Sequence, residues 1–110
     1  FRFHLTSEVV MSVAYSWGIT KDLQTSKLPG EKSLVGLRGP RGVQMTVEEM
    51  KAHEKCQRFR MKDDDGEVYV EGVLVDLSGD ASGFEPLDDY GMGGLGCTSI
   101  EYWEKGWKAL

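Results

Sequence analysis

The sequence predicts an α+β domain: a mainly antiparallel β-sheet, one short helix at about 46–56, and a long acidic, glycine-rich loop at 76–97. The observations behind this prediction are an alternating segment early in the chain, a hairpin turn between two further alternating segments, and one helix-capping pattern. The chain has 110 residues, which suits one compact domain. We therefore expect a single domain covering residues 1–110.

The first strand is predicted within residues 9–19, where the side chains alternate with period two. β-branched and aromatic side chains at this spacing fit a pleated sheet, although a helix starting at Ser7 would also group several apolar residues. We favour the strand because Val, Tyr and Trp dominate the segment. The large apolar residues that would face the core are Val9, Met11, Val13, Tyr15, Trp17 and Ile19.

A polar connection is predicted after this strand. Residues 20–33 contain few apolar side chains and include the turn signal Pro29-Gly30, so we expect a loop. Residues 34–37 are more apolar, and we expect them to form a short strand before the glycine-rich segment 38–42.

The helix prediction rests on a capping box. The Thr46 hydroxyl can accept a hydrogen bond from the Glu49 amide, while the Glu49 carboxylate can accept one from the Thr46 amide. Two acidic residues in the first turn also suit the positive end of the helix dipole. A helix of about two to three turns should follow and end near residues 53–56.

Residues 57–75 are predicted to form a β-hairpin, because Asp65-Gly66 is a strong two-residue turn signal between alternating segments. A turn at that position would pair Asp64 with Glu67, Met61 with Val70, and Arg60 with Glu71. The Asp64 and Glu67 pair would bring like charges together, so a longer connecting loop is the alternative.

The last third of the chain is predicted to be mostly irregular before two closing strands. Residues 76–97 contain six glycines and several acidic residues, and a loop of this length in a compact domain is often functional. Alternation then predicts a strand at 98–103, and a short final strand is expected at 107–110.

Charge is sorted along the chain. Residues 1–62 carry 11 Lys and Arg against 6 Asp and Glu, whereas residues 63–110 carry 2 against 12. An electronegative surface is expected if the second segment forms one face. The overall acidity argues against direct nucleic-acid or membrane binding by the whole molecule, although a local basic patch in the first segment stays open. Two cysteines are too few for a disulfide framework, so we expect free thiols and a cytoplasmic protein.

A glycine-rich motif and a group of acidic residues resemble ligand sites but lack the surrounding pattern that such sites require. Residues 91–96 match G-x-G-x-x-G, but no predicted strand precedes them and no helix follows, so we interpret them as a flexible loop rather than a nucleotide site. The acidic residues of the hairpin and the loop offer oxygen ligands for a cation, but the spacing of an EF-hand is absent. We expect no cofactor.

The histidines and cysteines are weak candidates for a metal site. His53 and Cys56 are three residues apart and could share a helix face, and His4 and Cys97 would complete four ligands. Zinc sites normally show two close-spaced pairs, and only one is present. Cys97 is also a weak candidate nucleophile, because a nearby acidic loop disfavours the thiolate.

Two segments resemble small uncharacterised bacterial, plasmid and phage proteins. They are RFRMKDDDGEVYVEG at 58–72 and GFEPLDDYG at 83–91, the latter followed by GCT at 96–98. The resemblance covers about a third of the chain. It implies a microbial accessory protein and supplies no activity or catalytic residue.

The leading hypothesis from the sequence is a non-enzymatic protein that docks a basic protein surface on an acidic face. The partner would be a nucleic-acid-binding protein if the chain is a phage- or plasmid-type inhibitor that mimics nucleic-acid charge. The alternatives are a small metal-dependent hydrolase and a self-assembling homo-oligomer. The predicted binding residues are Asp63, Asp64, Asp65, Glu67, Phe84, Glu85, Asp88, Asp89, Tyr90 and Trp103.

Overall fold

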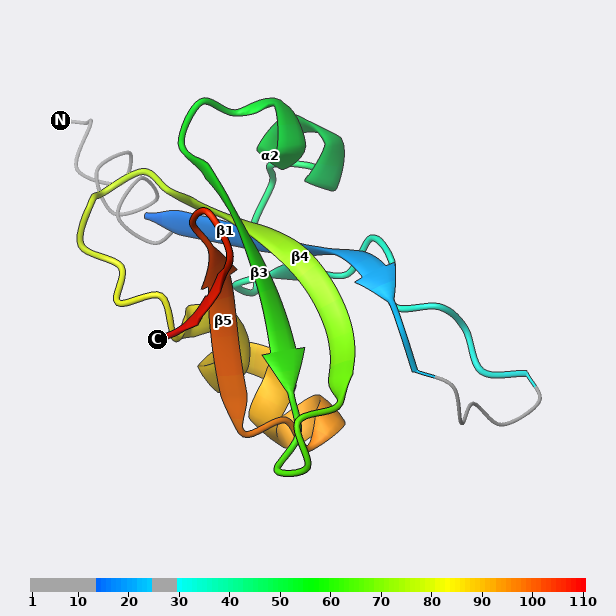
Figure 1. Ribbon diagram of the computed structural model, residues 1–110. Helices are drawn as coiled ribbons and strands as arrows, with labels where there is room; N and C mark the ends of the chain where they lie inside the picture. The colour runs from blue at the N-terminus through cyan, green and yellow to red at the C-terminus, as the bar shows by residue number, and fades with distance from the viewer. Residues whose placement is uncertain (1–13, 25–29) are drawn as a thin grey trace, which may run out of the picture.

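The computed structural model describes residues 14–24 and 30–110, and it confirms the mainly antiparallel α+β architecture (Figure 1). Six strands form one sheet in the order β2-β1-β4-β3-β5-β6. The strands are β1 (Tyr15–Asp22), β2 (Arg38–Gly39), β3 (Cys56–Lys62), β4 (Val68–Asp76), β5 (Ser99–Trp103) and β6 (Trp107–Ala109). The helices are α2 (Val47–Ala52) and the π-helix η1 (Leu87–Leu95).

The larger core lies on the face of the sheet that η1 covers. Alternate residues of the central strands point to this face, as period-two geometry requires. Trp17 and Ile19 are both buried there, as the alternation in β1 predicts. The remaining buried members of this cluster are Phe59, Met61, Val70, Leu74, Leu87, Cys97 and Ile100.

The opposite face is covered at one end by α2, which packs on β1, β3 and β4. Met50 of α2 is fully buried against Val73 and Val75 of β4. Gly18 makes this close packing possible, because a Cβ at that position would lie 2.7 Å from a methyl group of Val47. The rest of this face extends beyond the helix.

The predicted capping box is confirmed. The Glu49 amide donates to Thr46 Oγ1 at 3.1 Å, and the Thr46 amide donates to Glu49 Oε1 at 2.8 Å. The helix is shorter than predicted, because it ends at Ala52 and its C-cap His53 is already extended, with ψ of 141°.

The predicted hairpin is confirmed as β3 and β4, with Met61 opposite Val70 and Arg60 opposite Glu71. The two-residue turn is wrong, and the longer loop is present instead. The register shifts after Met61, so that Lys62 pairs with Val68. Asp63 Oδ1 accepts hydrogen bonds from the backbone amides of residues 65 and 67, which holds a wider turn and separates the acidic side chains.

The predicted loop at 76–97 contains a nine-residue π-helix, η1. The sequence did not predict this helix because its glycines are typical of a loop. One of them, Gly91, is needed for packing. A Cβ at that position would overlap the Met61 sulfur, so glycine lets the helix approach β3 closely. Gly96 then ends the helix in a left-handed conformation with φ of 75°.

Two predictions early in the chain need correction or fall outside the described residues. The expected strand at 34–37 is a turn, because Gly36 has φ of 98° and the Leu37 amide donates to the Leu34 carbonyl. The edge strand β2 forms directly after it. The predicted loop at 20–33 begins later than expected, since β1 continues to Asp22. Residues 9–13 of the predicted first strand lie outside the described residues.

Candidate functional site

The sheet face beyond α2 carries an unusual concentration of arginine, lysine and tryptophan side chains. Alternation in β3 and β5 points these residues away from the main core, because their neighbours Phe59, Met61 and Ile100 are buried on the other side. We call this region the open sheet face. Its residues on the strands are Thr20, Lys21, Arg58, Arg60, Lys62, Glu71, Glu101, Trp103 and Trp107, and we include Lys51, which reaches this face from α2.

Two arginines and two tryptophans form a cluster of cation–π and edge-to-face contacts at one end of this face. The Arg58 guanidinium lies 5.3 Å from the Trp103 ring centroid and 5.4 Å from that of Trp107. Arg60 approaches Trp107 to 4.6 Å, and the two indoles meet edge to face at 5.5 Å. Cation–π contacts of this kind hold a guanidinium in place while leaving its N–H groups available. The cluster therefore presents an oriented cation at the surface.

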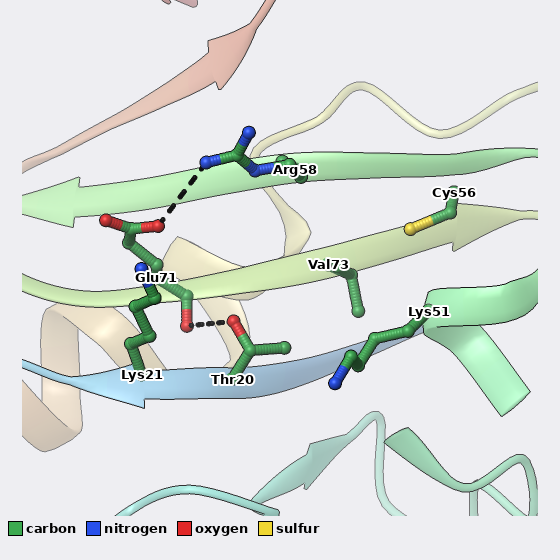
Figure 2. Close-up of a pocket in the computed structure, with 7 residues that line it drawn as sticks. All are labelled: Thr20, Lys21, Lys51, Cys56, Arg58, Glu71 and Val73. Carbon is green, nitrogen blue, oxygen red and sulfur yellow. Dashed lines mark hydrogen bonds and ion pairs between the residues drawn. The ribbon is translucent and has the colours of Figure 1, made fainter. Parts of the chain in front are cut away.

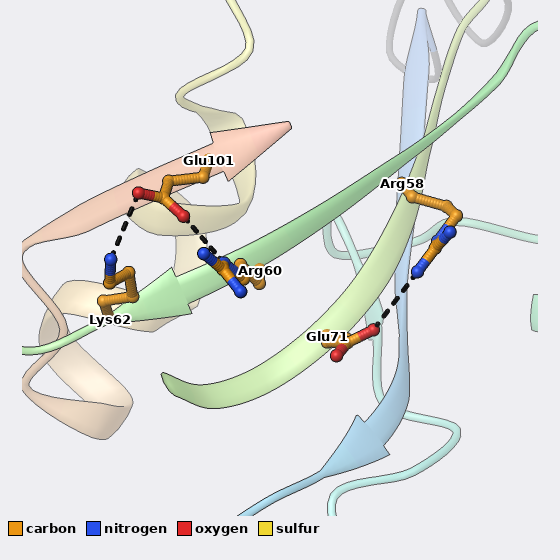
Figure 3. Close-up of polar contacts among 5 residues, drawn as sticks. All are labelled: Arg58, Arg60, Lys62, Glu71 and Glu101. Carbon is orange, nitrogen blue, oxygen red and sulfur yellow. Dashed lines mark hydrogen bonds and ion pairs between the residues drawn. The ribbon is translucent and has the colours of Figure 1, made fainter. Parts of the chain in front are cut away.

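Three charged side chains form a tight network beside the cluster (Figure 3). Arg60 Nε donates to Glu101 Oε1 at 2.7 Å, and Lys62 Nζ donates to Glu101 Oε2 at 3.2 Å. Burial acts to raise the pKa of Glu101, but the hydrogen bonds from Arg60 and Lys62 outweigh it and hold that pKa below its usual value. Both oxygens of this carboxylate are thus occupied by cations from β3.

Arg58 is held less tightly than Arg60. Its Nη2 atom lies 3.7 Å from Glu71 Oε1, beyond ordinary hydrogen-bond distance. Its side chain is 54% exposed, compared with 24% for Arg60. Arg58 is therefore the arginine of this face that is best placed to contact a ligand.

A groove of about 570 Å³ lies between α2 and the open sheet face, with Arg58 on its border (Figure 2). Strands β1, β3 and β4 form its floor, and Lys51 reaches it from α2. Three cations line it against one carboxylate, so its local charge is positive although the chain as a whole is acidic. The lining residues are Thr20, Lys21, Lys51, Cys56, Arg58, Glu71 and Val73.

The acidic residues predicted to bind a partner form two groups. The first group is the β3–β4 turn, where Asp63 is engaged by backbone amides and Asp64, Asp65 and Glu67 are exposed. The hydrogen bond from the Glu67 amide is the main reason that the pKa of Asp63 is lowered. This carboxylate stabilises the turn.

The second acidic group lies at the start of η1. Asp89 Oδ2 accepts hydrogen bonds from Tyr15 Oη and Trp17 Nε1, both at 2.9 Å. Burial is the larger cause, and the hydrogen bond to Asp89 the second, of a rise in the pKa of Tyr15 to about 12. Glu85 accepts hydrogen bonds from the backbone amides of Ser82 and Gly83, whereas Asp88 is exposed.

These two groups lie toward opposite ends of β4. The turn adjoins Val68, whereas the Asp89 group contacts Trp17, which pairs with Leu74. Six residues of strand span roughly 20 Å. The structure therefore does not join the two groups into one compact acidic site.

The predicted aromatic anchors are also separated. Phe84 is exposed beside the second acidic group, and Tyr90 packs against Trp17 with ring centroids 6.3 Å apart. Trp103 is 47% exposed but lies on the open sheet face, with the arginines. Trp103, which we predicted to bind together with the acidic residues, therefore lies among basic side chains instead.

The weak metal and thiol candidates are not brought together. Cys97 is buried in the core under η1, while Cys56 packs beside α2 on the other face of the sheet. Burial and the nearby Asp63 carboxylate raise the pKa of Cys97 to about 11, and burial raises that of Cys56. His53 Nδ1 accepts a hydrogen bond from the Lys55 amide. His4 lies outside the described residues.

Among residues 14–24 and 30–110, no three His, Cys, Asp or Glu side chains gather as metal ligands would. No helix in this part of the chain has the length and apolar character needed to cross a bilayer. The G-x-G-x-x-G segment lies within and just after η1, without the strand before it that a dinucleotide site requires.

Comparison with known proteins gave no relative: no family model, curated protein or solved structure matches the chain. The function must therefore be inferred from the side chains that the protein exposes. Sequence reasoning missed Arg58, Arg60 and Trp107. Period-two alternation across β3 and β5 was the available signal, because it places both arginines on the face opposite Phe59 and Met61.

Proposed function

We propose that this protein is a non-enzymatic binding domain that holds an anionic partner on its open sheet face. The observation that carries the proposal is Arg58, which is half exposed, makes cation–π contacts with two indoles and borders a groove with Lys21 and Lys51. A guanidinium that is fixed in this way loses little freedom when it binds an anion.

The balance of charge on this face supports an anionic partner. Five cations face two carboxylates there, and both carboxylates are already engaged by arginine or lysine. The local balance is therefore about +3, opposite in sign to the net charge of −5. Interaction over a few ångströms depends on this local charge, because more distant charges are screened within about 8–10 Å at physiological ionic strength.

The groove chemistry favours binding over catalysis. Its thiol, Cys56, has a raised pKa because of burial, so it is a poor nucleophile at neutral pH. Its one carboxylate, Glu71, forms an ion pair with Arg58, with 3.7 Å between Oε1 and Nη2. A nucleophile paired with a base would be required for covalent catalysis.

Binding of heparin tests this proposal, because heparin is a flexible polyanion without aromatic rings. We expect the wild type to bind at low salt, with affinity that falls steeply as salt is added. The double variant Arg58→Gln/Lys51→Gln should bind at least tenfold more weakly. The matched control is Lys105→Gln/Lys108→Gln, which removes two exposed cations outside the groove and should change affinity little. Equal affinity of the two double variants would refute the proposal.

A second candidate function is docking of a basic protein through the exposed carboxylates of the β3–β4 turn. Asp64, Asp65 and Glu67 project at the end of the hairpin, which suits contact with a cationic surface. The triple variant Asp64→Asn/Asp65→Asn/Glu67→Gln should then lose binding to a polylysine probe. Unchanged binding by this variant would remove this candidate, including its form as a mimic of nucleic-acid charge.

Self-association combines the two surfaces, because the acidic turn of one copy complements the open sheet face of another. Size-exclusion chromatography at low and high salt tests this alternative. If the two surfaces pair in this way, oligomers should form at low salt and dissociate as salt rises, since exposed charge pairs are weakened by screening. A monomer at both salt concentrations would eliminate self-assembly.

A further inference from the structure

We infer, on the basis of the function proposed above, that the anionic partner of the open sheet face is a single-stranded nucleic acid. The inference comes from the aromatic part of this face. Cations alone suit any polyanion, but this surface combines them with an exposed indole. Single strands offer phosphates for cations and flat base faces for aromatic side chains.

Trp103 has the exposure and support that a stacking residue needs. It is 47% exposed, and on this face it contacts the Arg58 guanidinium and the Trp107 ring. Trp107 meets it edge to face, with an interplanar angle of 72°, and so limits its movement. An exposed indole beside a guanidinium suits a ligand that has both a ring face and a negative charge.

The spacing across the sheet suits a strand of several nucleotides. Trp103 lies on β5, Arg58 on β3, and Lys21 on β1, with β4 between the last two. Neighbouring strands lie about 4.8 Å apart, so this path covers roughly 14 Å. Phosphates advance about 3.4 Å per nucleotide along the axis of a stacked helix and lie farther apart in an extended strand, so at most about four can follow the path. A base on Trp103 thus places the following phosphates near Arg58 and in the groove.

A duplex fits this face less well than a single strand. Base faces are hidden in a duplex, so Trp103 would have no ring to stack on. The only helix bordering the groove among the described residues, α2, has six residues and two acidic side chains in its first turn. Such a helix is too short and too negative to enter a major groove.

The acidic turn restricts where the strand can lie. Residues 63–67 follow directly after Lys62, at one end of the open sheet face. Phosphates would be repelled there, so the strand should run across β5, β3 and β4 near Arg58 rather than toward the turn. Neutralising Asp64 and Asp65 should consequently strengthen binding.

Fluorescence anisotropy with labelled dT20 tests the inference at low salt, with a 20-base-pair duplex and polyglutamate as competitors. We expect dT20 to bind more tightly than either competitor. Trp103→Ala should weaken dT20 binding by about five- to a hundredfold, while Trp103→Phe should retain most of the affinity. Heparin has no ring to stack and Trp107 still contacts Arg58, so heparin binding by Trp103→Ala should fall less than dT20 binding. An equal loss of heparin and dT20 binding would contradict base stacking. Urea unfolding of each variant shows whether it is folded.

The outcomes separate this inference from the function on which it depends. If heparin or polyglutamate binds through Arg58 but dT20 does not, the nucleic-acid inference fails and the anion-binding function stands. If duplex binds better than dT20, or if Trp103→Ala folds and binds dT20 normally, the inference also fails. If no polyanion binds at low salt, both proposals fail.

Discussion

Replacing Glu101 with Gln removes the negative centre of the network on the open sheet face. The wild-type carboxylate accepts hydrogen bonds from Arg60 at 2.7 Å and Lys62 at 3.2 Å. Glutamine keeps the shape but not the charge, so the repulsion between Arg60 and Lys62 would no longer be offset by a carboxylate between them. The variant should therefore be less stable at neutral pH and should bind polyanions more tightly.

The size of the stability loss follows from burial. Removing one partner costs about 3–5 kcal/mol for a fully buried ion pair and about 0–1 kcal/mol for an exposed one. Glu101 is 14% exposed and its two partners are moderately exposed, which places the network between these limits. We expect a loss of about 2 kcal/mol in the free energy of unfolding, or roughly 1 M in the urea midpoint.

The pH dependence gives a sharper test. Because the pKa of Glu101 is lowered in the folded state, its contribution to stability is complete above the ordinary carboxylate pKa of about 4.3. This contribution is lost as pH falls through the lower folded-state value. Urea midpoints of wild type and Glu101→Gln should therefore differ at pH 7 and converge in acid.

The matched control is Glu104→Gln. Glu104 is 81% exposed and lies 3.7 Å from Lys108, so its replacement should change stability by no more than about 0.5 kcal/mol. A Glu101→Gln deficit that persists undiminished in acid would refute the electrostatic explanation. Equal effects of the two substitutions would refute it as well.

Three further predictions concern the fold. Gly72→Ala should cost about 1–3 kcal/mol, because the methyl group would overlap a backbone carbonyl of β1 and a phenyl ring of β3. At Gly93 an added Cβ would meet open space, so Gly93→Ala should not lower the urea midpoint. A larger loss of stability for Gly93→Ala than for Gly72→Ala would contradict the packing. Thr46→Ala should lower stability by about 1 kcal/mol through loss of the cap, and an unchanged thermal midpoint would argue against this role. Cys97 should react with a thiol reagent more slowly than Cys56, as single Cys→Ser variants would show; equal rates would contradict its burial.

Much of the fold was predictable because its elements depend on local patterns. The capping box located α2, and centring the hairpin on Asp65-Gly66 gave the pairs Met61 with Val70 and Arg60 with Glu71. η1 was not predictable, because the fit of Gly91 against Met61 depends on contact between distant segments. The turn length was also missed, since Asp63 binds backbone amides that become available only when the longer loop has formed.

The candidate site was harder to predict because charge along a sequence does not give charge on a face. Sorting at residue 62 suggested one acidic surface, but antiparallel pairing sets Glu101 beside Arg60 and Lys62. The exposed carboxylates predicted to bind lie instead in the β3–β4 turn and at the start of η1. Trp103 is 47% exposed, so it is accessible to a ligand, but the residues around it depend on which strands lie next to β5.

The outermost strands of the described sheet have a consequence for the mode of recognition. β2 contains two residues and β6 contains three, so each offers only a short row of backbone groups for pairing with an incoming peptide. Strand addition depends on a longer row of main-chain hydrogen bonds, and short borders also oppose edge-to-edge aggregation. If the proposed function is right, we expect its partner to be recognised by side chains on the sheet face rather than by addition of a strand to the sheet.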